Sequence, residues 1–122
     1  MAKYLMLIYG DERKWAAMTP GEIDKLDAGH RAFRAAAEKM AGVAVLDGQE
    51  LEPANVATTL RTDGDGRPST TDGPFLETKE AVGGYYLVEA GDLDQVIALT
   101  KELYEVTAGH SGVEIRPIVN RG

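Results

Sequence analysis

The feature that most constrains the fold is an unbroken apolar run, YLMLIY, at residues 4–9. A short run without polar alternation is typical of a strand that is buried on both of its faces. Only two long helices are predicted in the chain, and together they would cover one face of a sheet. The run therefore predicts a sheet whose second face is covered by another subunit.

Two helices are predicted from their start signals. Thr19 can cap the first, Pro20 suits its first position and Glu22 completes a capping box. Asp92 can cap the second, with Gln95 three residues later. The first apolar stripe is Ile23, Leu26, Phe33, Ala37 and Met40, and His30 fills its one gap before Gly42 ends the helix. The second apolar face is Leu93, Val96, Ile97, Thr100, Leu103 and Tyr104.

Further strands are predicted at residues 43–46, 56–62, 67–71, 85–89 and 113–117. Asp47 and Gly48 indicate a turn or bulge, and DGDG at residues 63–66 indicates a hairpin turn. Pro68 indicates that the strand at residues 67–71 lies at the edge of a sheet. This order predicts one α+β domain over residues 1–122, ferredoxin-like βαββαβ with an extra short hairpin strand. Two copies are expected to close face to face into a dimeric α/β barrel.

Charge and composition exclude several classes of protein. Thirteen basic and twenty acidic residues give a net charge of −7, which disfavours binding to nucleic acid and to anionic membranes. The absence of cysteine excludes disulfides and thiolate metal sites. The apolar run is too short for a signal peptide or a membrane span. We therefore expect a cytoplasmic protein, and without a phosphate loop, dinucleotide fingerprint or nucleophile elbow we predict no cofactor.

A family resemblance rests on DGPF at residues 72–75, ETKE at 77–80 and GGYY at 83–86. With YLMLIY, ATTLR at 57–61 and VEIRP at 113–117, these segments resemble the DGPF branch of the YCII-related family over nearly the whole chain. The resemblance implies a ferredoxin-like protomer in a dimeric α/β barrel. Some members of the branch that it resembles are linked to extracytoplasmic-function sigma factors. This chain itself contains no sigma-factor segment.

The better-studied branch of that family is proposed to use a histidine–aspartate pair in a pocket. His30 lies in the corresponding helix. The aspartate of that branch follows the second helix, near residues 102–105, where this chain has ELYE and no Asp-Pro. The pair is therefore not carried over intact.

Asp72 and His30 are the predicted catalytic residues. A carboxylate held in a Gly-Pro turn has the fixed position that an acid–base group needs, and burial would raise its pKa. Alternatively, Asp72 organises the turn by bonding its own backbone. His30 on the inner helix face is a candidate base, or a core or interface histidine with one satisfied hydrogen bond.

Ligand binding is predicted for Arg61, Phe75, Glu77, Lys79 and Tyr85. Arg61 or Arg116 suits a carboxylate of a small acidic ligand, but each also suits a cross-strand ion pair. Glu77 and Lys79 would complete a polar pocket with Asp72, or form a solvated ion pair. Tyr85, Tyr86 and Trp15 are candidate cavity walls, with core or interface as the alternative.

No metal site is predicted. The DGDG segment lacks the closing glutamate of a calcium loop, and His110 has no second histidine at ligand spacing. Three functions remain open. The first is a cofactor-free acid–base enzyme acting on a small acidic or carbonyl compound. The second is a metabolite-binding module that reports to a partner such as a sigma factor. The third is an interaction protein with a filled core, and fold alone does not choose between them.

Overall fold

The computed structural model describes residues 1–121, and its centre is an antiparallel sheet of four strands in the order β2-β5-β1-β6. The two central strands are β1 (Ala2–Asp11) and β5 (Glu80–Ala90), and the two edges are β2 (Ala44–Glu50) and β6 (Ser111–Pro117). A helix connects β1 to β2 and another connects β5 to β6. This order and these crossovers are compatible with the predicted ferredoxin-like fold.

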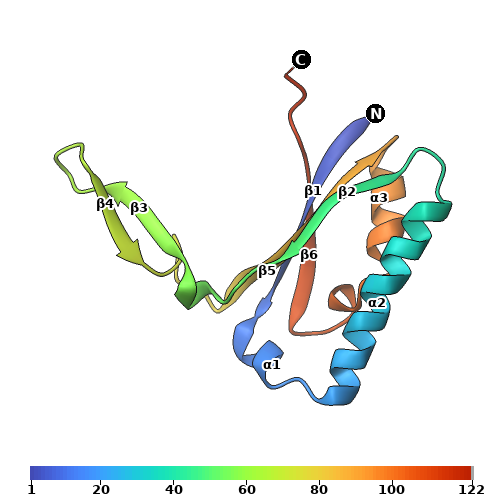
Figure 1. Cartoon of the computed structure of the whole chain (residues 1–122), viewed down its shortest axis with the longest axis horizontal. Coiled ribbons are helices and arrows are strands. Elements are labelled where there is room, and N and C mark those ends of the chain that lie inside the picture. The colour runs from blue at the N-terminus through green and yellow to red at the C-terminus, as the bar shows by residue number, and fades with distance from the viewer. Residues whose placement is uncertain (122) are drawn as a thin grey trace.

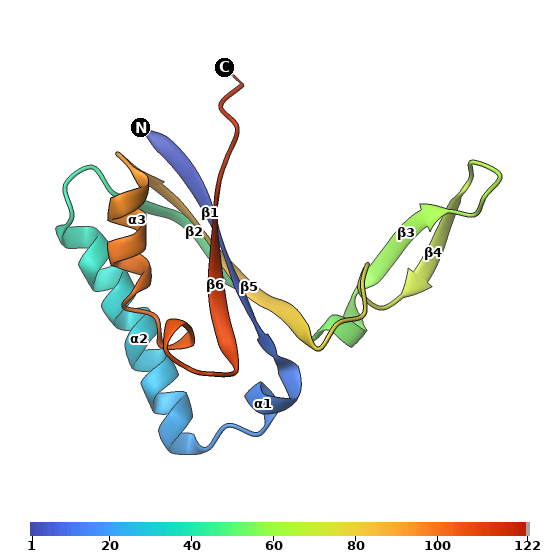
Figure 2. The same cartoon turned by 180° about the vertical axis from the view of Figure 1, so that it is seen from behind.

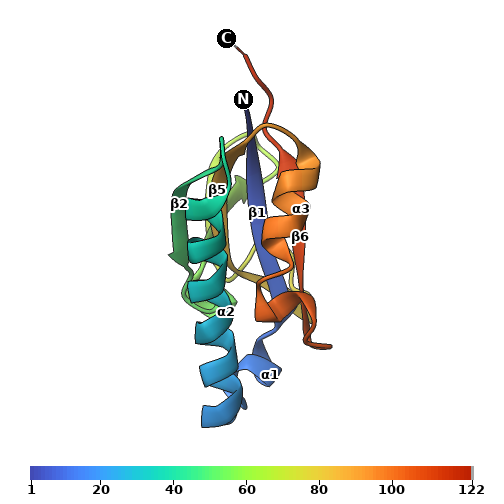
Figure 3. The ribbon, with the colours of Figure 1, turned by 90° about the vertical axis from the view of Figure 1, so that its right-hand side faces the viewer.

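The helices lie on one face of this sheet (Figures 1 and 3). They are α2 (Pro20–Lys39), α3 (Leu93–Thr100) and a short α1 (Glu12–Ala16) that the sequence did not predict. Both predicted caps are confirmed: Thr19 Oγ1 accepts from the Glu22 N–H at 3.2 Å, and Asp92 Oδ1 accepts from the Gln95 N–H at 2.9 Å. None of the helices in the described residues is both long and apolar enough to cross a lipid bilayer.

The apolar run alternates between two environments along β1. Tyr4, Met6 and Ile8 are buried against the helices, with 7%, 0% and 6% of their surface exposed. Leu5, Leu7 and Tyr9 are half-buried on the face that no helix covers. One face of the run is therefore buried within the chain, and burial of the other by a second subunit stays a prediction.

The core between sheet and helices is built mainly from β1, β5, α2 and α3. Phe33, Val88, Val96 and Leu99 are almost fully buried there. The prediction is wrong for three apolar positions, because Ile23, Leu93 and Ile97 are 43%, 43% and 38% exposed. Their side chains keep much of their surface in contact with solvent instead of joining the core.

The helices also end earlier than the apolar pattern suggests. Leu103 follows α3, and Tyr104 lies in a 3₁₀ turn, η2 (Tyr104–Val106). This turn carries Glu105 beside α2 and β6.

A hairpin projects from the end of the main sheet, toward the side away from the helices (Figures 1 and 2). After the turn η1 (Ala54–Val56), strands β3 (Thr58–Thr62) and β4 (Pro68–Asp72) pair antiparallel as a separate sheet. The hairpin turn at 63–66 is confirmed. One extra strand was expected, but two strands lie outside the main sheet. We call residues 57–76 the arm.

Candidate functional site

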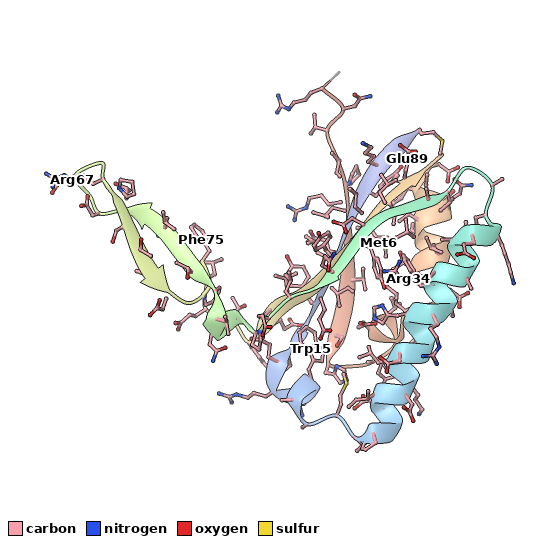
Figure 4. All side chains as sticks on the ribbon, viewed as in Figure 1. Met6, Trp15, Arg34, Arg67, Phe75 and Glu89 are labelled. Atoms are coloured by element: carbon pink, nitrogen blue, oxygen red, sulfur yellow. The ribbon has the colours of Figure 1, made fainter. Side chains whose placement is uncertain are left out.

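A cavity of about 470 Å³ opens between the first half of α2 and the neighbouring part of β1, β2 and β5. Its walls are apolar at one end, where Trp15, Met18, Ile23 and Leu26 contribute, and polar at the other, where His30 and Arg34 contribute. Figure 4 shows Trp15 near the α1 end of the sheet and Arg34 between α2 and the sheet.

The helix repeat explains why α2 supplies so much of this wall. Ile23, Leu26, His30 and Arg34 follow one another at intervals of three or four residues, and Asp27 is next to Leu26, so these side chains share one face of the helix. Further along the same face, Phe33 and Ala37 are buried against the sheet. The first half of α2 therefore has its inner face directed at open space.

Three polar side chains form a hydrogen-bonded chain in this cavity, which we call the relay. The Tyr86 hydroxyl lies 2.6 Å from Nδ1 of His30, and Nε2 of His30 lies 2.8 Å from Oε2 of Glu105. A carboxylate can only accept, so Nε2 carries a proton and donates it to Glu105. With a neutral ring, Nδ1 then accepts from Tyr86; with a protonated ring, Nδ1 donates to Tyr86.

The two ends of the relay are buried. Tyr86 is 6% exposed and Glu105 is 5% exposed. Burial raises the pKa of the Tyr86 phenol, against a smaller lowering effect of the Arg34 guanidinium. Tyr86 is therefore a protonated phenol at neutral pH. The second carboxylate oxygen of Glu105, Oε1, has no hydrogen-bond partner among the described residues.

A glycine opposite Tyr86 makes room for its ring. Gly48 pairs with Tyr86 across β2 and β5, just past the bulge that was predicted around Asp47 and Gly48. A Cβ atom at Gly48 would lie 2.4 Å from Cδ1 of Tyr86. The Phe33 ring packs on the other side of the phenol, with 4.4 Å between ring centroids. The phenol is thus fixed between a bare strand and a buried aromatic ring.

Trp15, at the apolar end, is held in a similar way. Cβ atoms at Gly10 and Gly83 would lie 2.4 and 2.5 Å from its indole ring. Its Nε1–H donates to Ser111 Oγ at 2.8 Å. Both neighbouring glycines are therefore needed for the indole to lie flat on the sheet.

A second polar network extends from Ser111 to the start of α2. Ser111 Oγ lies 2.6 Å from Nδ1 of His110, and Nε2 of His110 lies 3.0 Å from Oε2 of Glu22. The Tyr104 hydroxyl donates to the same Glu22 oxygen at 2.5 Å. Hydrogen bonds from Tyr104 and His110 lower the pKa of Glu22. The Glu22 carboxylate thus joins α2 to η2 and to the residue that precedes β6, a role that the predicted capping box did not include.

The structure separates the two predicted catalytic residues within one chain. His30 lies in the cavity, whereas Asp72 ends β4 on the arm, paired with Thr58, and is not part of the cavity wall. Arg61, Phe75, Glu77 and Lys79 also lie outside this wall. Lys79 instead borders a more open hollow of about 520 Å³ beside Lys14 and His110.

Tyr85 borders the relay cavity, and its hydroxyl donates to Asp47 Oδ2 at 2.6 Å. Arg116 forms an ion pair at 2.6 Å with Glu114, which lies two residues before it on the same strand, so this is not the cross-strand pair given as its alternative. Within residues 1–121, no three His, Cys, Asp or Glu side chains gather closely enough to hold a metal ion.

The DGPF segment builds the base of the arm. Gly73 has φ +105°, a conformation that favours glycine, and its N–H donates to the Ala57 carbonyl at 2.7 Å. Thr59 Oγ1 donates to the Gly73 carbonyl at 2.7 Å. Arg61 donates to the Phe75 carbonyl at 2.8 Å and stacks on the Phe75 ring at 3.8 Å. These contacts fasten residues 73–75 alongside β3.

Glu105 and Arg34 are site residues that sequence reasoning missed. Arg34 follows His30 by one helical turn on the same stripe, so the spacing carried a signal for it. Glu105 comes from a turn 75 residues away from His30. The resemblance points to residues 102–105, where this chain has ELYE and no aspartate, so it did not identify Glu105.

Comparison with known proteins agrees with the resemblance seen in the sequence. The YCII-related domain family matches residues 2–120. An uncharacterized protein of Rhizobium meliloti (strain 1021) is 32% identical over 119 residues, which cover 94% of this chain and 90% of that protein.

Proposed function

The chain belongs to the YCII-related family, and from its relay we propose that it binds a small molecule and moves a proton on it without a cofactor. The observation that carries this proposal is the hydrogen-bonded chain from Tyr86 through His30 to Glu105 in the wall of a cavity. The cavity is within the usual size range of small-molecule sites.

The relay can supply and recover a proton. When His30 is protonated, both of its N–H groups donate, and the Tyr86 hydroxyl hydrogen is available to a ligand oxygen or carbon. As Tyr86 gives up this proton, it takes the Nδ1 proton of His30, and the ring becomes neutral with Nε2–H still donated to Glu105. The reverse sequence removes a proton from the ligand. Isomerisation, elimination and hydrolysis all use such transfers.

Glu105 acts through His30 in this scheme. Its carboxylate fixes the ring orientation and stabilises the imidazolium, as the acid member does in other acid–histidine pairs. The exposure of the two side chains fits these roles, since that of His30 is 28% and that of Glu105 is 7%. His30 is thus the more exposed member of the pair, and Glu105 is the more buried one.

We also propose that the protein works as a homodimer. The sheet face without helices carries the half-buried Leu5, Leu7 and Leu87. The arm carries Leu60, Phe75 and Leu76, which are 63–66% exposed. A two-stranded hairpin is only marginally stable alone, so contact with a second copy would stabilise the arm. In such a dimer, the arm of one subunit would bring its Asp72 toward the site of the other subunit.

Screening small acids and carbonyl compounds tests the proposal, with thermal stabilisation and turnover as parallel readouts. Tyr86→Phe and Glu105→Gln should lower turnover by about two orders of magnitude with smaller effects on binding. Stabilisation without turnover would instead identify a sensing module. Turnover that survives in both variants would exclude the relay as the proton carrier.

A further inference from the structure

The polar end of the cavity presents a cation without a carboxylate partner. The ion pairs among the described residues use His30, His110 and Arg116, so none of them engages Arg34. Its guanidinium instead lies 5.3 Å from the centre of the Tyr86 ring. An arginine in this position can hold a ligand carboxylate through two parallel hydrogen bonds.

The same cavity also presents a buried acceptor. Glu105 is 5% exposed and lines the wall, and its Oε1 has no hydrogen-bond partner among the described residues. A buried, unsatisfied carboxylate oxygen is costly, and a cationic donor offsets that cost most effectively. Asp27 lines the wall nearby on α2. These carboxylates suit a ligand ammonium group.

The order of groups along α2 then describes the ligand. Arg34 lies at one end, His30 and Asp27 follow toward the start of the helix, and Leu26 and Ile23 come next. From Arg34 to Ile23 the helix rises about 16 Å. Trp15 and Met18 complete the apolar end. In an α-amino acid with an apolar side chain, the carboxylate and the ammonium are both bonded to Cα, so such a ligand would place its two charges at the polar end and its side chain toward the apolar end.

We infer that the cavity binds a zwitterion with an apolar body, of the α-amino acid class. Arg34 holds its carboxylate, Glu105 Oε1 accepts from its ammonium, and the apolar wall packs on its side chain. A simple carboxylate would leave Oε1 unsatisfied and add a negative charge beside Asp27, Glu50 and Glu105. A simple amine would leave Arg34 without a carboxylate partner. This inference rests on the proposed function, because it names the ligand of the same cavity.

Matched probes test the inference by calorimetry at neutral pH. For four apolar bodies, those of valine, leucine, methionine and phenylalanine, the amino acid is compared with the corresponding acid and amine. For phenylalanine these are 3-phenylpropanoate and 2-phenylethylamine. At least one amino acid should bind about tenfold or more tightly than both of its partners, the equivalent of about 1.4 kcal/mol. An acid that binds as tightly as its amino acid would overturn the inference.

Variants of Arg34 and Glu105 test the two proposed charged contacts with the ligand. Arg34→Gln should weaken the amino acid and the acid at least tenfold and leave the amine unchanged. Glu105→Gln should weaken the amino acid and the amine and leave the acid unchanged. A general loss of structure would weaken all three probes together. Arg31→Gln is the control, because Arg31 is exposed on the same helix outside the cavity wall. An equal effect of Arg31→Gln and Arg34→Gln would contradict the assignment.

The experiments distinguish failure of the zwitterion assignment from failure of the proposed binding function. If compounds from the broader acid and carbonyl screen bind but none of the four amino acids does, the zwitterion assignment is wrong and the binding function stands. If no compound from either set binds, both are wrong.

Discussion

Nε2 of His30 lies 2.8 Å from Oε2 of Glu105, although the two residues are 75 positions apart in the chain. The first comes from the middle of α2 and the second from the 3₁₀ turn η2. The structure therefore contains a histidine–carboxylate pair, and its acid is a glutamate.

Loss of His30 and loss of Glu105 should lower the free energy of unfolding by different amounts. His30→Ala leaves the buried Glu105 carboxylate without its partner and should lower the free energy of unfolding by roughly 3 kcal/mol. Glu105→Ala leaves the more exposed His30 still bonded to Tyr86, and should cost only about 1–2 kcal/mol. Urea unfolding of the two variants measures the difference. Equal losses, or a larger loss for Glu105→Ala, would contradict this account of the pair.

Gly48 should not tolerate a side chain. In Gly48→Ala the new Cβ would lie 2.4 Å from the Tyr86 ring, so the ring or strand β2 must move. We expect a loss of roughly 1–3 kcal/mol of stability and changed Tyr86 resonances in NMR spectra. Gly112→Ala is the matched control, since a Cβ there meets nothing within 4 Å. Similar losses in both variants would show that the contact with the Tyr86 ring is not responsible.

Acid should weaken the Glu22 network. The pKa of Glu22 in the folded protein is lowered from its ordinary value of 4.5 by hydrogen bonds from Tyr104 and His110. A lowered pKa stabilises the folded state above 4.5, and this contribution is lost as the pH falls through the folded pKa. Glu22→Gln should therefore have a lower Tm than the parent at pH 6, and the gap should narrow toward pH 3. A gap that is constant over this range would contradict the assignment.

The proposed dimer predicts opposite outcomes for two changes. Leu7→Asp places a charge in the centre of the sheet face that no helix covers. It should give monomers in sedimentation or light-scattering measurements. Asp72→Asn should leave the dimer intact. Dissociation of Asp72→Asn would assign Asp72 a structural role, and a parent protein that is itself monomeric would remove the dimer from the proposal.

Much of the fold follows from local signals in the sequence. Thr19 and Asp92 begin their helices as predicted, because each cap depends only on residues nearby in the chain. The hairpin turn at residues 63–66 is local in the same sense. The position of the arm is not local, since strand propensity does not state which sheet a strand joins. Strands β3 and β4 were thus recognised as strands, and their separation from the main sheet was not foreseen.

Part of the candidate site could also be predicted from local signals in the sequence. His30 interrupts an apolar stripe, and helical spacing alone places it toward the sheet. Glu105 and Tyr86 reach it only through tertiary packing of η2 and β5 against α2. The sequence therefore indicated His30 and, as a candidate cavity wall, Tyr86, but not their connection to Glu105. Asp72, which a prominent motif favoured, lies on the arm.

The chain contains a single tryptophan, and Trp15 forms the apolar end of the cavity. All indole emission from the protein therefore originates at the site itself. A molecule entering beside the ring changes the polarity and quenching around one known fluorophore, so occupancy can be followed in real time without any label. The same signal separates events at this wall from changes on the distant arm, which contains no tryptophan.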